Sequence, residues 1–162
     1  MQEPSPTEYG NSTAFLLSQI GARSAELFAA RLTPLGITPR QFAVLSNLAA
    51  AGSMTQQQLS DALGIHRNNM VGLIDEMEAA GWVRRHRGTS DRRVFEIQTT
   101  DTGRELIAAV NELIPELDEL LTGELVTADR QALTRALAMI ARHLGLTQAV
   151  HPHVARRRRE VG

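Results

Sequence analysis

The sequence predicts a mainly α-helical fold with one small β-hairpin, and three neighbouring patterns support this prediction. One segment carries apolar residues at the i, i+3, i+4, i+7 spacing of a helix docked by one face: Met70, Leu73, Ile74 and Met77. A shorter helical segment, 55–63, precedes it and ends at Gly64. Residues 81–103 follow as a β-hairpin whose return strand alternates apolar and polar side chains. Helix, turn, helix and hairpin is the order of a winged helix-turn-helix unit, here predicted for residues 34–102.

Two segments precede this unit. Residues 1–12 contain two prolines and mostly polar side chains, which predicts a flexible N-terminal arm. A helix is expected from Thr13 to Leu32, because its apolar residues fall on one face. We assign this segment, 13–33, to a dimerisation helix.

Several helix ends have clear sequence signals. Thr38 and Thr55 are each followed three residues later by glutamine, the capping-box spacing that begins a helix. A long helix is expected after the hairpin, and Pro115 should bend it or split it. Thr127 is expected to cap a last helix that ends at Gly145.

The terminal helices offer more apolar surface than a small winged unit needs, which predicts a homodimer. Residues 103–146 are therefore assigned to dimerisation helices, together with 13–33. Residues 147–162 contain four consecutive arginines and are expected to form a basic flexible tail. The alternative is that the terminal helices fold back onto their own domain.

Length and composition limit the remaining possibilities. The 162 residues, 43% of them hydrophobic, suffice for one domain with a dimerisation appendage but not for a second, enzyme-sized module. No run of about 18 apolar residues is present, and the first residues lack a signal-peptide pattern. We therefore expect a cytoplasmic protein with no membrane partner. The absence of cysteine excludes disulfides, thiolate metal sites and thiol switches in this chain.

The hairpin is strongly basic near its tip. Five arginines stand there against one carboxylate, Asp91, for a local charge of +4: Arg84, Arg85, Arg87, Arg92 and Arg93. The whole chain has a formal net charge of only −1. Because the local field governs a docking surface, this contrast predicts contact with nucleic acid by the hairpin and the helix before it.

Short motifs between Leu59 and Gly103 resemble the MarR family of bacterial transcription regulators. They are Leu-Ser-Asp-Ala-Leu-Gly-Ile-His-Arg-Asn-Asn-Met-Val, Gly-Trp-Val, Asp91-Arg92-Arg93, and Thr100 with Gly103. The order of predicted elements agrees from Thr13 to Leu144. The resemblance implies a homodimer that binds a pseudo-palindromic operator, most often as a repressor. It also implies release by a small, often aromatic or phenolic ligand held between the dimer helices and the winged unit.

Three positions depart from the family pattern, and one of them is Gly72, which stands on the outward face of the second helix where a larger polar residue is frequent. His66 stands at the start of the second helix, where serine is common, so we expect the usual side-chain cap to be lost. Thr99 stands where leucine is usual and is expected to pack by its methyl group on the face of Phe95 and Ile97. These changes affect the expected operator sequence and not the expectation of DNA binding.

The residues expected to contact DNA lie at the start of the second helix and in the hairpin. They are His66, Arg67, Asn68, Asn69, Val71, Gly72, Arg84, Arg85, Arg92 and Arg93. In the major groove, arginine can read guanine, asparagine adenine and valine a thymine methyl group. Arg93 is expected in the minor groove, and Asp91 is expected to support the wing by pairing with an arginine. The alternative is that these side chains form a merely solvated face.

A ligand pocket is expected between the first helix, the helix after Thr38 and the helix after the hairpin. Its apolar lining would be Leu17, Ile20, Phe42, Leu45, Leu106 and Val110. Such a lining with arginine or histidine at its rim favours small aromatic acids or phenols. The same residues could instead fill a core.

The sequence contains no pattern for catalysis. It has no nucleophile elbow, Walker loop, dinucleotide fingerprint or His-Glu-x-x-His, and its five histidines form no compact ligand set. We expect no catalytic residue, cofactor or metal, and three partners: double-stranded DNA, a second copy of the chain and a small-molecule effector. The alternative function is a winged-helix protein-interaction module without specific DNA binding, which the arginine-rich hairpin disfavours. An enzyme is a distant third.

Overall fold

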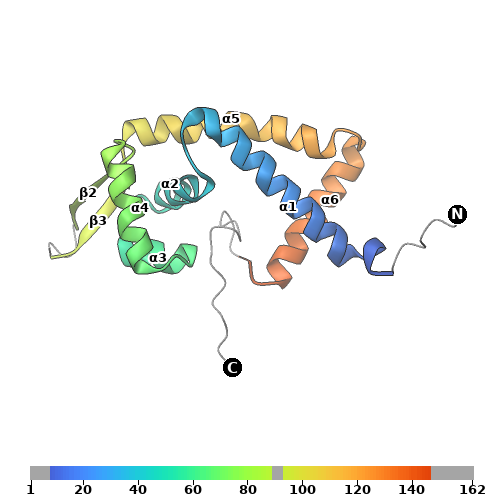
Figure 1. Cartoon of the computed structure of the whole chain (residues 1–162), viewed down its shortest axis with the longest axis horizontal. Coiled ribbons are helices and arrows are strands. Elements are labelled where there is room, and N and C mark those ends of the chain that lie inside the picture. The colour runs from blue at the N-terminus through green and yellow to red at the C-terminus, as the bar shows by residue number, and fades with distance from the viewer. Residues whose placement is uncertain (1–7, 89–92, 147–162) are drawn as a thin grey trace, which may run out of the picture.

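The structure, a computed structural model, describes residues 8–88 and 93–146 (Figure 1). Most of the predicted N-terminal arm, the wing tip with Asp91 and Arg92, and the predicted tail lie outside the described residues. The elements in chain order are η1 Glu8–Asn11, α1 Thr13–Leu32, η2 Thr33–Leu35, α2 Pro39–Ala51, β1 Met54–Thr55, α3 Gln56–Leu63, α4 Arg67–Ala79, β2 Val83–Arg87, β3 Phe95–Thr99, α5 Asp101–Thr122 and α6 Thr127–His143. The fold is mainly helical with a small β-sheet, as the sequence predicts.

The helices arrange the molecule as two ends joined by α5 (Figure 1). Helices α2, α3 and α4 gather with the sheet at one end, on the left in Figure 1. Helix α5 runs from there along the length of the molecule to the other end, where α6 follows. Helix α1 contacts both α2 and α5, so the winged unit is attached to the rest of the chain by two helices.

The sheet has three antiparallel strands in the order β1-β3-β2. Strands β2 and β3 pair from Val83 opposite Thr99 to Arg87 opposite Phe95, which confirms the predicted hairpin. Strand β1, whose Met54 lies opposite Ile97, was not predicted from the sequence. A strand of two residues is too short to have a recognisable period.

Most predicted helix starts are confirmed. Helix α1 has the expected bounds, and Thr38 and Thr55 each form a complete capping box with the glutamine three residues later. The prediction for His66 was wrong, because its ring Nδ1 accepts a hydrogen bond from the backbone N–H of Asn68 at 3.3 Å and so caps α4.

The C-terminal helices differ from expectation in two respects. Pro115 does not split α5, which remains one helix from Asp101 to Thr122. The cap position of α6 is Val126, without a side-chain hydrogen bond, and Thr127 is already the first helical residue. Proline removes one backbone hydrogen bond within a helix, and the neighbouring turns keep α5 continuous.

The hydrophobic core lies at the winged end and reaches the first half of α5. Its fully buried residues are Leu32, Val44, Leu45, Leu48, Leu59, Leu63, Met70, Ile74, Met77 and Val110. The predicted stripe on α4 is thus confirmed, with Leu73 packed against this core. Trp82 also packs against it.

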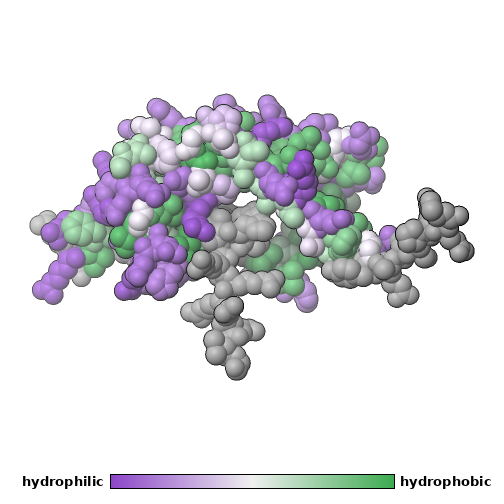
Figure 2. All heavy atoms as spheres, in the orientation of Figure 1, coloured by the Kyte–Doolittle hydropathy of each residue, from purple (hydrophilic) through white to green (hydrophobic). Residues whose placement is uncertain are grey.

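The other end of the molecule exposes many large apolar side chains. They are Leu16, Leu17 and Ile20 on α1, Leu120 and Leu121 on α5, Leu125 and Val126 in the turn, and Leu133, Leu137, Met139 and Ile140 on α6. Figure 2 shows hydrophobic side chains at the surface where α5 meets α6. No residue of α6 is buried within the chain. Among the described residues, no helix is both long enough and apolar enough to cross a membrane.

Candidate nucleic-acid interface

Helix α4 presents a polar face because its apolar stripe is used for packing. Met70, Ile74 and Met77 point into the core, while an exposed set remains on the other side: His66, Arg67, Asn68, Asn69, Val71 and Gly72. An open groove of about 970 Å³ runs between this first turn of α4 and helix α3. The structure therefore brings together the six residues that the sequence assigned to α4 and its cap.

A hydrogen-bonded chain crosses this groove from α3 to α4. Arg67 donates from its guanidinium to the side-chain oxygen of Gln57. Gln57 in turn donates from its amide nitrogen to Asp61 Oδ1 at 2.8 Å. Gln57 and Asp61 were not predicted from the sequence as part of the site, because both resemble ordinary exposed positions of a short helix.

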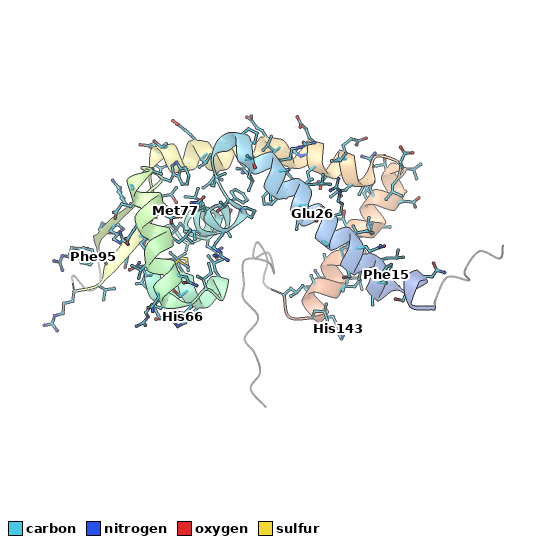
Figure 3. All side chains as sticks on the ribbon, viewed as in Figure 1. Phe15, Glu26, His66, Met77, Phe95 and His143 are labelled. Atoms are coloured by element: carbon cyan, nitrogen blue, oxygen red, sulfur yellow. The ribbon has the colours of Figure 1, made fainter. Side chains whose placement is uncertain are left out.

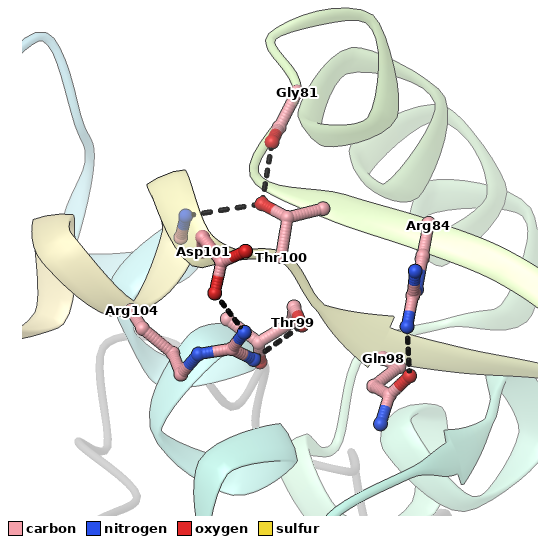
Figure 4. Close-up of polar contacts among 8 residues, drawn as sticks. Gly81, Arg84, Gln98, Thr99, Thr100, Asp101 and Arg104 are labelled. Atoms are coloured by element: carbon pink, nitrogen blue, oxygen red, sulfur yellow. Dashed lines mark hydrogen bonds and ion pairs between the residues drawn. The ribbon is translucent and has the colours of Figure 1, made fainter.

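The wing carries arginines on both faces of its sheet. Arg84 donates to Gln98 Oε1 at 2.9 Å across the strands (Figure 4). Arg87 lies over the ring of the half-exposed Phe95, with 4.7 Å between its Cζ and the ring centroid. Such a cation–π contact holds the guanidinium in one place while leaving its charge near solvent. Arg93 is exposed at the edge of the described wing.

Arg85 differs from Arg84 and Arg87, because two carboxylates of α4 hold its guanidinium. It is ion-paired with Asp75 at 2.5 Å and with Glu78, both on α4, and its side chain is only 23% exposed. Its backbone N–H also donates to Glu78 Oε1 at 2.9 Å. Burial alone would lower the pKa of Arg85, but hydrogen bonds to Asp75 and Glu78 and their charges outweigh it, so the pKa is raised. Arg85, predicted as a DNA contact, ties the wing to α4.

Helix α5 begins at a junction that joins it to both strands of the wing (Figure 4). Thr100 caps α5 by accepting from Gly103 N at 3.1 Å, and its hydroxyl donates to the carbonyl of Gly81 at 2.6 Å. The Thr100 N–H donates to the carbonyl of Trp82 at 3.0 Å. Arg104 donates to the Thr99 carbonyl at 3.0 Å. Thr100 is thus needed to cap α5 and to bind the chain before β2. Gly103 is needed because a Cβ there would lie 2.2 Å from the carbonyl oxygen of Trp82.

Thr99 is buried beside this junction. Its methyl carbon would lie 2.7 Å from a Cβ placed on Gly103, so the methyl group packs against Gly103 at the start of α5. Its hydroxyl has no hydrogen-bond partner in the described part of the chain.

The predicted ligand pocket is not assembled within one chain. Leu45 and Val110 are fully buried in the core, and Phe42 and Leu106 pack against it, whereas Leu17 and Ile20 are exposed. Four of the six residues thus contribute to the core and two face solvent, and the ligand pocket stays a prediction. A different, open groove of about 500 Å³ lies between α1 and α5, lined by Gln19, Ile20, Arg23, Leu27, Leu120 and Leu121.

The described residues contain no group of three His, Cys, Asp or Glu side chains that could hold a metal ion.

The fold and the site together define a winged helix-turn-helix regulator that binds DNA. The MarR family model matches residues 37–95. PecS, an HTH-type transcriptional regulator of Dickeya dadantii (strain 3937), is 30% identical over 111 residues, which are 67% of each chain. The chain therefore belongs to the MarR family of transcription regulators and is not an enzyme.

Solved structures agree with this assignment. The transcriptional repressor CouR, in complex with a 23-mer DNA duplex, has a TM-score of 0.73 and 33% identity over 86% of this chain and 99% of its own. BpsR of Bordetella bronchiseptica has a TM-score of 0.68 and 22% identity over 85% and 98%. The second similarity concerns the fold alone.

Proposed function

We propose that the protein is a homodimeric repressor that binds a pseudo-palindromic operator. The observation that carries this proposal is the exposed run from His66 to Asn69, which begins α4 at the end of the molecule where the wing also lies. Figure 3 places His66 at one end of α4 and Phe95 on the neighbouring wing. Helix α4 would enter the major groove, and the wing would follow the flanking backbone and minor groove.

Each DNA-contacting residue has a role in this proposal. Arg67, Asn68, Asn69 and Val71 read base edges, and Gly72 allows the backbone of α4 to approach them. Arg84, Arg92 and Arg93 bind phosphates or the minor groove. Arg85 holds the wing against α4, while Asp91 supports the tip. CouR, a repressor solved with DNA, supports this arrangement. A cytoplasmic location follows from the DNA partner.

The dimer in this proposal uses the apolar ends of α1, α5 and α6. In a monomer these side chains would form a contiguous exposed apolar surface. Single, scattered apolar residues are normal on a protein surface, but a contiguous patch marks an interaction site. The two copies would place their α4 helices about 34 Å apart, or a multiple of it, to enter major grooves on one face of DNA.

Substitutions in α4 and in the wing should have different effects on base preference. Asn68→Ala and Asn69→Ala are expected to weaken discrimination by about 1–3 kcal/mol at one position per half-site, because a bidentate contact to a base edge is lost. Arg93→Ala should weaken binding to any sequence, since minor-groove and phosphate contacts carry little base information. The measurement is binding of the full chain to a duplex selected from a randomised library and to random DNA.

The matched control is Asn111→Ala, an exposed asparagine on α5, which should change neither affinity. Equal losses on selected and random DNA for both α4 variants would contradict base reading. Absence of any sequence preference in the unsubstituted chain would favour the protein-interaction module instead.

We also propose release from DNA by a small aromatic acid or phenol held in the groove between α1 and α5. Its volume lies within the usual range of small-molecule sites, and Arg23 offers a cation for a carboxylate or phenolate. The regulation of BpsR by 6-hydroxynicotinic acid supports this ligand class. Salicylate titrated into the DNA complex should lower DNA affinity, and DNA should lower salicylate affinity by the same factor. If salicylate and simple phenols bind the free protein without changing DNA affinity, the groove is not a regulatory site.

A further inference from the structure

The first residue of α4 is tied to α3 by two consecutive side-chain hydrogen bonds. Arg67 donates to Gln57 Oε1, and Gln57 Nε2 donates to Asp61 Oδ1 at 2.8 Å. Gln57 and Asp61 are four residues apart on α3, so they lie on the same face of that helix. All three side chains are exposed and border the groove between the two helices.

We propose that Gln57 and Asp61 are positioning residues that set the base preference of Arg67. This proposal rests on the proposed function, in which Arg67 meets base edges in the major groove. The base preference of one operator position would then depend on two residues of α3 that need not touch that base.

The carboxylate of Asp61 determines which way the amide of Gln57 points. An amide has a donating nitrogen at one end and an accepting oxygen at the other. With its nitrogen toward Asp61, the oxygen faces the guanidinium of Arg67. The reversed amide would place oxygen against carboxylate and N–H against guanidinium, two repulsive contacts. Asp61 thereby makes Gln57 present its accepting oxygen, and not its N–H groups, to Arg67.

The oxygen of Gln57 restricts the direction of the Arg67 guanidinium. A guanidinium has five N–H donors in one plane, and the bond to Gln57 uses its Nη2 group. Other donors remain for the O6 and N7 acceptors of a guanine. A long side chain that is already oriented loses less conformational freedom on binding, which is worth roughly 2- to 10-fold in affinity per side chain.

Without this restraint, Arg67 would have a second class of partner. Phosphates attract any cation independently of sequence, and a flexible arginine at the start of α4 can reach toward them. Loss of Gln57 should therefore lower base preference more than total affinity. A merely structural role of Gln57 would instead lower binding to all sequences together.

The test compares base preferences of full-length variants on a library of duplexes with randomised half-sites. Arg67→Ala should lower the preference at one position per half-site by roughly 5- to 100-fold, the range of a bidentate contact. Gln57→Ala should lower the preference at that same position by about 2- to 10-fold. It should leave affinity for random duplex unchanged. In the Arg67→Ala background, Gln57→Ala should have no further effect.

Two substitutions of Asp61 form a matched pair, because both remove its charge. Asp61→Asn keeps a side-chain oxygen for Gln57 Nε2 and should retain the base preference. Asp61→Ala removes the acceptor and should reduce the preference as Gln57→Ala does. The difference between them reports the hydrogen bond and not the general attraction of DNA for a less acidic surface. Thermal unfolding of each variant checks that its fold is unchanged.

The outcomes separate this proposal from the proposed function. If Arg67→Ala loses base preference and Gln57→Ala does not, positioning by α3 is wrong while DNA reading by α4 stands. An increased preference in Gln57→Ala would also overturn the proposal, because Gln57 would then restrain Arg67 away from the base. If the unsubstituted chain selects no sequence at all, both proposals fail.

Discussion

Leu137→Glu is expected to convert the protein to a monomer and to lower its affinity for a two-half-site operator by about 100- to 10,000-fold. Helix α6 and its C-cap carry an apolar stripe at i, i+4, i+7 and i+11: Leu133, Leu137, Ile140 and Leu144. None of these side chains is buried within the chain, and in the proposed dimer a second copy would cover them. Burying a charged glutamate in that interface is unfavourable, so the two copies should separate. A single copy binds one half-site and lacks the added affinity that comes from binding two linked half-sites at once.

Analytical ultracentrifugation measures this outcome directly. The unsubstituted chain should sediment at about twice its 17.7 kDa mass, and Leu137→Glu at the mass of one chain. Met139→Glu is the matched control, because Met139 is 62% exposed yet lies off the apolar stripe of α6. It should remain a dimer. A Leu137→Glu variant that stays dimeric with unchanged operator affinity would show that α6 does not form the interface.

Gly103→Ala is expected to lower the free energy of unfolding by about 3 kcal/mol, near the upper end of the usual cost of overpacking. A Cβ at this position would lie 2.2 Å from the carbonyl oxygen of Trp82. That oxygen belongs to the backbone and also accepts the hydrogen bond from Thr100 N, so it has little freedom to move. The added methyl group must displace β2 from the first turn of α5.

Gly72→Ala provides the comparison, since a Cβ there meets no atom within 4 Å. Alanine inside a helix is more favourable than glycine by about 1 kcal/mol, and Gly72→Ala should raise stability by about that amount. Urea unfolding monitored by circular dichroism gives both values. Equal stability changes in the two variants would refute the steric explanation for Gly103.

The parts of the fold that could be predicted depend on signals within a few residues of one another. The capping boxes at Thr38 and Thr55 and the apolar stripe of α4 act locally, so the helices they specify were expected with nearly correct bounds. The hairpin itself was expected from the alternation in its return strand, and its pairing confirms it. Strand β1 escaped prediction because only its pairing with β3, more than forty residues later, makes it a strand.

The sequence predicted which residues lie at the site, but it was less able to predict what each of them does there. Sequence spacing places Arg67 and Asn68 on the polar face of α4. It cannot show that Arg85 pairs with Asp75 and Glu78, because this pairing depends on how the wing packs against α4. The same limit applies to the expected ligand pocket. An apolar stripe in the sequence does not reveal whether its side chains line a pocket or fill the core.

The hydrogen bonds of Thr100 have a mechanical consequence for the dimer. Trp82 donates to the Met77 carbonyl near the end of α4 at 2.9 Å, and Thr100 binds the carbonyls of Gly81 and Trp82. These hydrogen bonds connect α4, the wing and the start of α5, so we expect the three to move together. Helix α5 has 22 residues and is about 33 Å long. A tilt of about 5° at its far end therefore displaces the DNA-contacting surface by about 3 Å without any change inside the winged unit.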